Sequence, residues 1–153
     1  MLKLIKSLFG RKSVTDSIAV DYAGRPVGQE VLEAVVRLLI EITRSDSDIA
    51  DEEATAIMDV VMTYFAESEE HIPALLRRVA DQTKQGENLN EVFALLNQTY
   101  SPDQRVLLLS VCWRIVMADG EIARSERKFA TQLRYRFQLS EDQERVAREL
   151  AEG

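Results

Sequence analysis

The chain has 153 residues, of which 46% are hydrophobic and 29% charged, so it is long enough to bury one core and is not of the disordered class. Its formal net charge of −7 excludes a general nucleic-acid binder, which needs a basic surface. The single cysteine, Cys112, excludes an internal disulfide and favours a reducing compartment, so we expect a cytoplasmic protein. No run approaches the roughly 18 apolar residues that a membrane-spanning helix requires.

Residues 1–12 form a short basic segment with the pattern of an amphipathic helix. Its apolar residues recur at three-and-four spacing and are Leu2, Ile5, Leu8 and Phe9; its cations are Lys3, Lys6, Arg11 and Lys12. Such a helix packs on the domain, frays as chain termini commonly do, or contacts the anionic inner face of a membrane. Gly10 to Gly28 contains glycine and proline without a sustained period and is interpreted as a linker. The predicted boundary therefore separates residues 1–28 from a helical domain at 29–153.

Helical periodicity continues through the rest of the chain. It predicts helices over residues 30–44, 49–66 and 89–97, one between Ser68 and Gly86, one carrying Phe129, Leu133 and Phe137, and two that start at the capping boxes Ser101–Gln104 and Ser140–Gln143. No stretch alternates with period two over the length of a strand. We therefore predict an all-α bundle of about seven helices, in addition to the N-terminal one.

The segment from Val106 to Met117 is apolar on nearly every side, interrupted only by Ser110 and Arg114. A helix with this composition has to be buried all round, so we expect it at the centre of the core. Cys112 and Trp113 lie within it and are interpreted as core residues. This helix runs directly into an acidic loop.

The acidic loop has a second copy earlier in the chain. Residues 45–53, SDSDIADEE, align without gaps on residues 118–126, ADGEIARSE. Each copy follows an apolar helix and precedes an amphipathic one. We infer two helix–acidic loop–helix units related by duplication, which would pack about a pseudo-twofold axis and bring the two loops together.

Gathering these carboxylates in one place is unfavourable without a counter-charge, because like charges oppose one another's ionisation. A divalent cation or a basic partner would supply that charge. Oxygen ligands suit Ca²⁺, Mg²⁺ or Mn²⁺ better than zinc, and His71 is the sole histidine. Neither loop is an EF-hand, because the sixth position is Asp51 or Arg124 where that motif requires glycine. The candidate metal ligands are Asp46, Asp48, Glu53, Asp119, Glu121 and Glu126.

A structural role for the same residues stays open. Asp48 can cap the helix that follows it, and Glu53 and Glu126 fall in or near a first helical turn. A negative charge there favours the helix dipole by roughly 0.3–1 kcal/mol. Capping alone, however, does not require the same spacing of acidic residues twice.

At these residues the chain resembles the TerB-like family, the tellurite-resistance protein B group of small bacterial helical domains. The resemblance covers about Glu30 to Leu150 and rests on VMADGEI at residues 116–122, on Glu126, on the face formed by Phe129 and Leu133, and on the weaker copy at residues 46–53. It implies an all-helical bundle with an acidic divalent-cation site built from both halves. It also implies links to stress response, to membrane-associated complexes and to J-domain co-chaperones.

Residue by residue, Asp119, Glu121, Glu126, Asp46 and Glu53 match the family's motif. The first copy departs from it, with Ser45 and Ser47 in place of Ala118 and Gly120.

The sequence thus favours a non-enzymatic binding module that holds a divalent cation or contacts a basic partner protein. The alternative is a peripheral membrane scaffold, anchored at the inner face of the membrane by residues 1–12, or a co-chaperone-type interaction domain whose acidic residues are purely structural. An enzyme is disfavoured because the chain has no phosphate-binding glycine loop and no recognisable nucleophile–base set.

Overall fold

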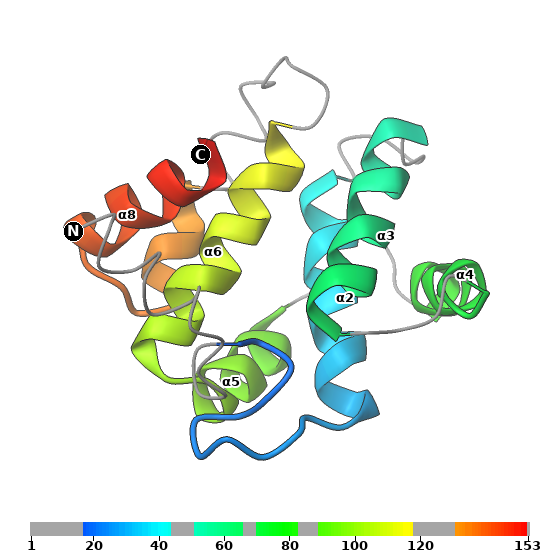
Figure 1. Cartoon of the computed structure of the whole chain (residues 1–153), viewed down its shortest axis with the longest axis horizontal. Helices are drawn as coiled ribbons and strands as arrows, with labels where there is room; N and C mark the ends of the chain where they lie inside the picture. Colours follow the sequence, from blue (N-terminus) through cyan, green and yellow to red (C-terminus); the bar gives the residue numbers. More distant parts are fainter. Residues whose placement is uncertain (1–16, 44–50, 66–69, 83–88, 118–130, 153) are drawn as a thin grey trace.

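The computed structural model describes residues 17–43, 51–65, 70–82, 89–117 and 131–152 (Figure 1). The helices are α2 (Gln29–Thr43), α3 (Asp51–Phe65), α4 (Ile72–Gln82), α5 (Asn90–Thr99), α6 (Pro102–Val116) and α8 (Glu141–Glu152), and residues 131–136 are helical as well. Across these ranges there is no strand, only an isolated antiparallel bridge between Val20 and Pro26. The prediction of an all-α fold with about seven helices is confirmed. The pseudo-twofold relation between the two halves stays a prediction.

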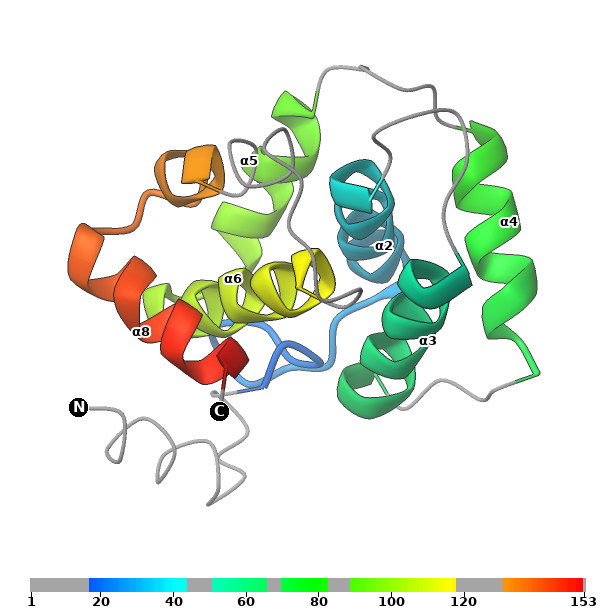
Figure 2. The same ribbon diagram turned by 90° about the horizontal axis from the view of Figure 1, so that it is seen from above.

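Helices α2 and α6 lie at the centre of the bundle. Figures 1 and 2 show α3 and α4 on the outer side of α2, and α8 on the far side of α6. All residues of α6 from Val106 to Val116 are buried except Arg114, as the apolar pattern predicted. Helix α6 therefore contributes apolar surface to the whole core, because α2, α3 and α8 all pack against it.

Both predicted capping boxes are present. At the start of α6, the Ser101 side chain accepts a hydrogen bond from the backbone N–H of Gln104, and the Gln104 side chain accepts one from the N–H of Ser101. At the start of α8, Ser140 and Gln143 make the same reciprocal pair. These bonds satisfy N–H groups that an uncapped helix leaves without partners, and so they fix where both helices begin.

Residues 17–28 form a packed segment, called here the N-terminal strap. The Gln104 side chain is fully buried, and its Nε2 donates to the carbonyl oxygens of Ser17 at 2.7 Å and Val20 at 2.9 Å. The Tyr100 hydroxyl donates to the carbonyl oxygen of Ile18 at 2.6 Å, and the Ile18 side chain is buried in the core. The sequence suggested a linker from Gly10 to Gly28, whereas its described part is tied to α5 and α6.

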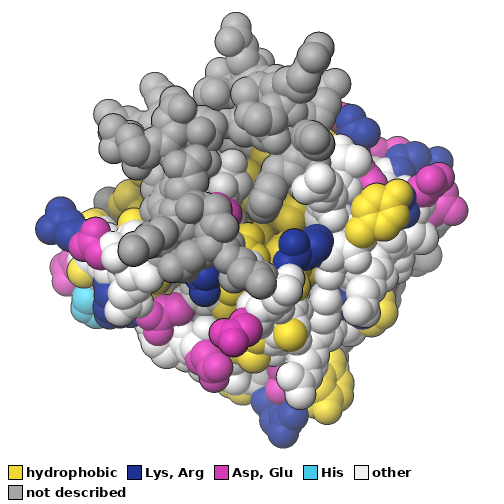
Figure 3. Space-filling model, turned by 180° about the vertical axis from the view of Figure 1, so that it is seen from behind, with side chains coloured by type: hydrophobic (Ala, Val, Ile, Leu, Met, Phe, Trp, Pro, Cys, Tyr) yellow, Lys and Arg dark blue, Asp and Glu magenta, His cyan; other side chains and the backbone are white. Residues whose placement is uncertain are grey.

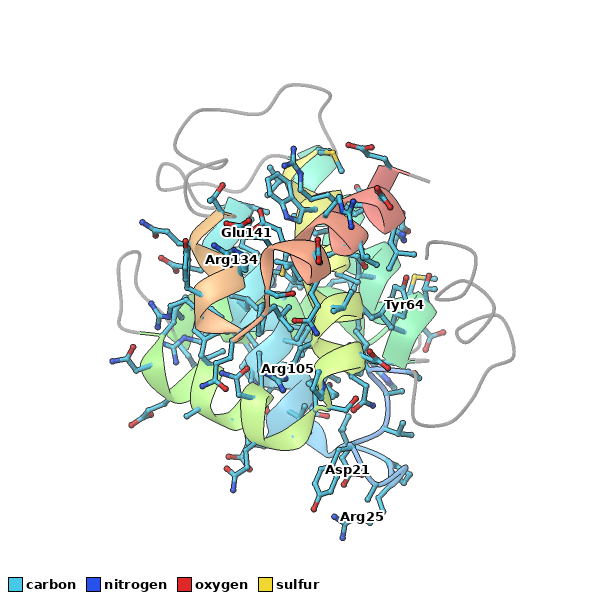
Figure 4. All side chains as sticks on the ribbon, turned by 90° about the vertical axis from the view of Figure 1, so that its left-hand side faces the viewer. Asp21, Arg25, Tyr64, Arg105, Arg134 and Glu141 are labelled. Atoms are coloured by element: carbon cyan, nitrogen blue, oxygen red, sulfur yellow. The ribbon has the colours of Figure 1, made fainter. Side chains whose placement is uncertain are left out.

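Asp21 closes a turn within the strap. Its Oδ1 accepts the backbone N–H groups of Ala23 and Arg25 at 2.8 and 2.9 Å, and its Oδ2 lies 3.1 Å from the Arg25 Nε (Figure 4). The backbone hydrogen bond from Arg25 is the largest cause that lowers the pKa of Asp21 below its usual 3.8. This turn therefore contributes stability that is complete above pH 3.8 and is lost as the pH falls through the lowered pKa.

Replacing Gln104 with alanine should destabilise the protein by roughly 2–4 kcal/mol, because the strap carbonyls lose a buried donor and a cavity is left. The matched control is Gln143→Ala, which removes the same capping-box residue at a more exposed helix start. That change should cost only about 0.5–1 kcal/mol. Urea unfolding followed by circular dichroism measures both free energies, and equal losses would contradict an anchoring role for Gln104.

Helical residues 131–136 end in a Schellman motif. The N–H of Gln138 donates to the carbonyl of Tyr135 at 3.0 Å, and the N–H of Leu139 donates to that of Arg134 at 2.9 Å. Gln138 has a φ of 58°, a left-handed conformation that usually selects glycine. The nearby Arg105 guanidinium donates to the Phe137 carbonyl at 2.6 Å, and burial at this position lowers the pKa of Arg105.

We expect Gln138→Gly to stabilise the protein by about 0.5–1 kcal/mol, because glycine adopts the left-handed conformation without a side-chain clash. The control is Gln98→Gly in α5, where the same substitution in a helix should instead cost about 0.5–1 kcal/mol. Thermal unfolding would show opposite shifts in Tm. A lower Tm for Gln138→Gly would show that the Gln138 side chain stabilises the motif.

Candidate functional site

The ends of α2 and α6 define the candidate site. The two helices pack against each other and run in the same direction, so their C-terminal ends lie at the same end of the bundle, which is uppermost in Figure 1. Helix α3 begins at that end too, and the view from above in Figure 2 agrees. The chain therefore leaves α2 and α6 on one side of the molecule, and each helix is followed in sequence by an acidic segment.

Local bonds fix how each helix finishes. At the end of α2, the buried Thr43 hydroxyl donates to the carbonyl of Ile40 at 2.8 Å. At the end of α6, the Met117 N–H donates to the carbonyl of Trp113 at 3.0 Å. The final turn of α2 carries no basic residue, and that of α6 carries only Arg114, whose Nη1 lies 3.4 Å from the Tyr64 hydroxyl.

A helix C-terminus bears a partial negative charge from its unpaired carbonyl groups and so favours a nearby cation. Here two such ends point the same way, and the final turn of α2 carries no basic side chain to neutralise its own end. The electrostatics of the described helices therefore favour positive charge at this end of the bundle.

The predicted ligands themselves lie almost wholly outside the described residues. Asp46 and Asp48 follow α2, and Asp119, Glu121 and Glu126 follow α6, all in ranges that the structure does not describe. Glu53 belongs to the first turn of α3, but only its backbone is described. Among the described residues, no group of three or more His, Cys, Asp or Glu side chains could hold a metal ion. The six-carboxylate site stays a prediction.

Trp113 is a buried residue near the end of α6, and its fluorescence can report on changes at this end of the bundle. It is 2% exposed, one turn before the end of α6, and the Arg148 guanidinium of α8 lies 4.8 Å from its ring centroid. Its Nε1 is buried and finds no hydrogen-bond partner in the described part of the chain. The sequence correctly predicted that Trp113 is buried, but no local pattern indicates the contact with Arg148.

Cys112 is also buried, as predicted, and desolvation raises the pKa of its thiol. A thiol that resists ionisation is a poor nucleophile and a poor metal ligand at neutral pH. This agrees with the core role predicted for Cys112.

This arrangement is that of a small all-α domain in which two central helices lead into two acidic segments. The family model described as tellurite resistance protein TerB matches residues 32–149, a range that includes both acidic segments. The chain belongs to the TerB family. No curated protein and no solved structure matches it. None of the helices in the described ranges is long and apolar enough to cross a membrane.

Proposed function

We propose that this TerB-family domain is a non-enzymatic binding module whose two acidic segments hold a divalent cation or contact a basic partner. The observation that carries the proposal is the shared direction of α2 and α6, from whose neighbouring ends the two segments continue. Repetition of the same acidic spacing in the sequence supports it independently.

The chemistry follows from charge. Six carboxylates confined to one end of the bundle, beside two helix C-termini, would repel one another and destabilise the fold. A Ca²⁺, Mg²⁺ or Mn²⁺ ion relieves this repulsion and accepts oxygen ligands. Because the second copy matches the family motif most fully, Asp119, Glu121 and Glu126 form the half of the proposed site with the stronger support.

Titration of the full chain with Ca²⁺, Mg²⁺, Mn²⁺ and Zn²⁺ tests the cation version. We expect calorimetric heat with at least one oxygen-preferring ion, accompanied by a change in the fluorescence of Trp113, the only tryptophan. The double variant Asp119→Asn with Glu126→Gln should weaken binding at least about tenfold, because two of the charged ligands become neutral.

The matched control is Asp103→Asn with Glu141→Gln, which removes two exposed first-turn charges at the starts of α6 and α8. It should leave the affinity within about twofold, because solvent screens distant charges. Absence of heat with every ion, or equal weakening by the two double variants, would refute the cation site.

A contact between residues 1–12 and a membrane surface is a second proposal, favoured by the cations of that segment. Each cation near an anionic membrane contributes about 1 kcal/mol. Lys3→Gln with Lys6→Gln should therefore lower cosedimentation with phosphatidylserine vesicles about tenfold or more. Arg77→Gln with Arg145→Gln, which removes two exposed cations from α4 and α8, is the control. Equal binding by both variants would end the proposal.

A further inference from the structure

Residues 21–25, called here the strap turn, form a braced turn at the end of the bundle where α6 begins (Figure 4). The Asp21 N–H donates to the Arg25 carbonyl at 2.7 Å, and the Tyr22 N–H donates to the carbonyl of Thr99 in α5 at 2.8 Å. The side-chain bonds of Asp21 described above hold the same turn. Because the backbone is fixed in this way, the turn presents its exposed side chains to a binding surface at little further cost in conformational entropy.

The strap turn exposes an aromatic ring. Tyr22 is 58% exposed, and the two charges of the turn, on Asp21 and Arg25, pair with each other at 3.1 Å. In Figure 3, basic and hydrophobic side chains project from the lower edge of the molecule, which is the end that holds the strap in Figure 1. A tyrosine ring has an apolar body and a polar tip, and tyrosine is enriched where a membrane meets water.

The strap also determines where the basic residues 1–12 leave the domain. The Gln104 Nε2 donates to the Ser17 carbonyl at 2.7 Å and to the Asp21 carbonyl at 3.3 Å, so both ends of residues 17–21 are held at the start of α6. Residues 13–16 add at most about 13 Å when extended. The basic segment and the strap turn can therefore contact one surface together.

The other surfaces of the domain are more acidic. The face opposite the strap, shown in Figure 3, holds an open groove of about 480 Å³ between α2, α4 and α5. Its carboxylates are those of Glu30, Glu33 and Glu91, and Arg78 at 3.4 Å neutralises only Glu33. The C-terminal ends of α2 and α6 lead into the acidic segments. An anionic membrane repels such surfaces, which leaves the strap end to approach it.

The helix starts at the strap end carry one carboxylate each, Glu30 in α2 and Asp103 in α6. Both stand in the first turn, where the positive end of the helix dipole offsets part of their charge. The four cations of residues 1–12 outnumber them, so the balance of charge at this end favours an anionic surface.

We propose that the strap turn is a second membrane contact, in which the Tyr22 ring enters the headgroup region of the anionic leaflet that residues 1–12 bind. The inference rests on the membrane contact proposed above and adds an orientation to it. The strap end faces the lipid, and the C-terminal ends of α2 and α6 face away from it. A cation or partner at those ends is then bound on the side of the domain away from the membrane.

A tryptophan placed in the turn tests the contact in the full chain. Tyr22→Trp is compared with Tyr135→Trp, which changes another exposed tyrosine, next to Arg134 and away from the strap (Figure 4). Buried Trp113 gives both variants the same background. With phosphatidylserine vesicles we expect a blue shift for Tyr22→Trp only. Brominated lipid should quench its emission about threefold more than that of Tyr135→Trp, because only the first ring reaches the headgroups.

Cosedimentation measures what the ring contributes to binding. Tyr22→Ser should lower binding to phosphatidylserine vesicles about threefold or more, and Tyr135→Ser should leave it within about 1.5-fold. Thermal unfolding of each variant establishes that it is folded. If the unmodified chain does not cosediment, the membrane contact itself fails and this inference fails with it.

If the unmodified chain binds, but Tyr22→Ser and Tyr135→Ser bind equally and lipid quenches neither tryptophan, only the role of the strap turn is overturned. A blue shift of Tyr22→Trp that grows with protein concentration in the absence of lipid overturns it as well, because the turn would then contact a second protein molecule.

Discussion

The packing of α2 against α6 is the contact on which the rest of the molecule depends. Both helices are apolar over most of their circumference, so neither can be stable unless other elements cover it. Helices α3, α4 and α5 cover α2, and α3 and α8 cover α6. Because the two central helices also run in the same direction, their contact determines where the chain emerges from the core.

The opposite end of the bundle is fixed by polar bonds rather than by burial alone. Gln104 is both a capping residue and a buried donor. Its amide oxygen accepts the N–H of Ser101 at the start of α6, and its amide nitrogen donates to strap carbonyls. Tyr100 adds a second buried donor from the end of α5. Groups buried in this way need their partners, so the strap's path is tied to the start of α6.

Much of the fold could be predicted because its determinants are local. The capping boxes at Ser101 and Ser140 and the apolar circumference of α6 are properties of adjacent residues, and the structure confirms them. The packing of the strap could not be predicted, because its partners are backbone carbonyls that no side-chain pattern encodes. The left-handed Gln138 was missed for a related reason, since the residue that usually marks such a helix end is glycine.

The candidate site could likewise be predicted only in its local features. Spacing identifies the carboxylates and their repetition, and the direction of the described helices supports bringing the two segments to one end. The distances between the carboxylates depend on the loop conformations, which lie outside the described residues and which no periodicity specifies. The groove between α2, α4 and α5 could not be predicted from the sequence either, because it is formed by residues of three helices that are separate in the chain.

The complete burial of Cys112 has a practical consequence. With no exposed surface and a thiol that resists ionisation, this residue can meet a labelling reagent only when the core around α6 opens. The rate at which Cys112 is modified under native conditions therefore measures how often the core opens, and mass spectrometry can follow it without any engineered probe. A ligand that binds the intact domain and not its open form will lower this rate.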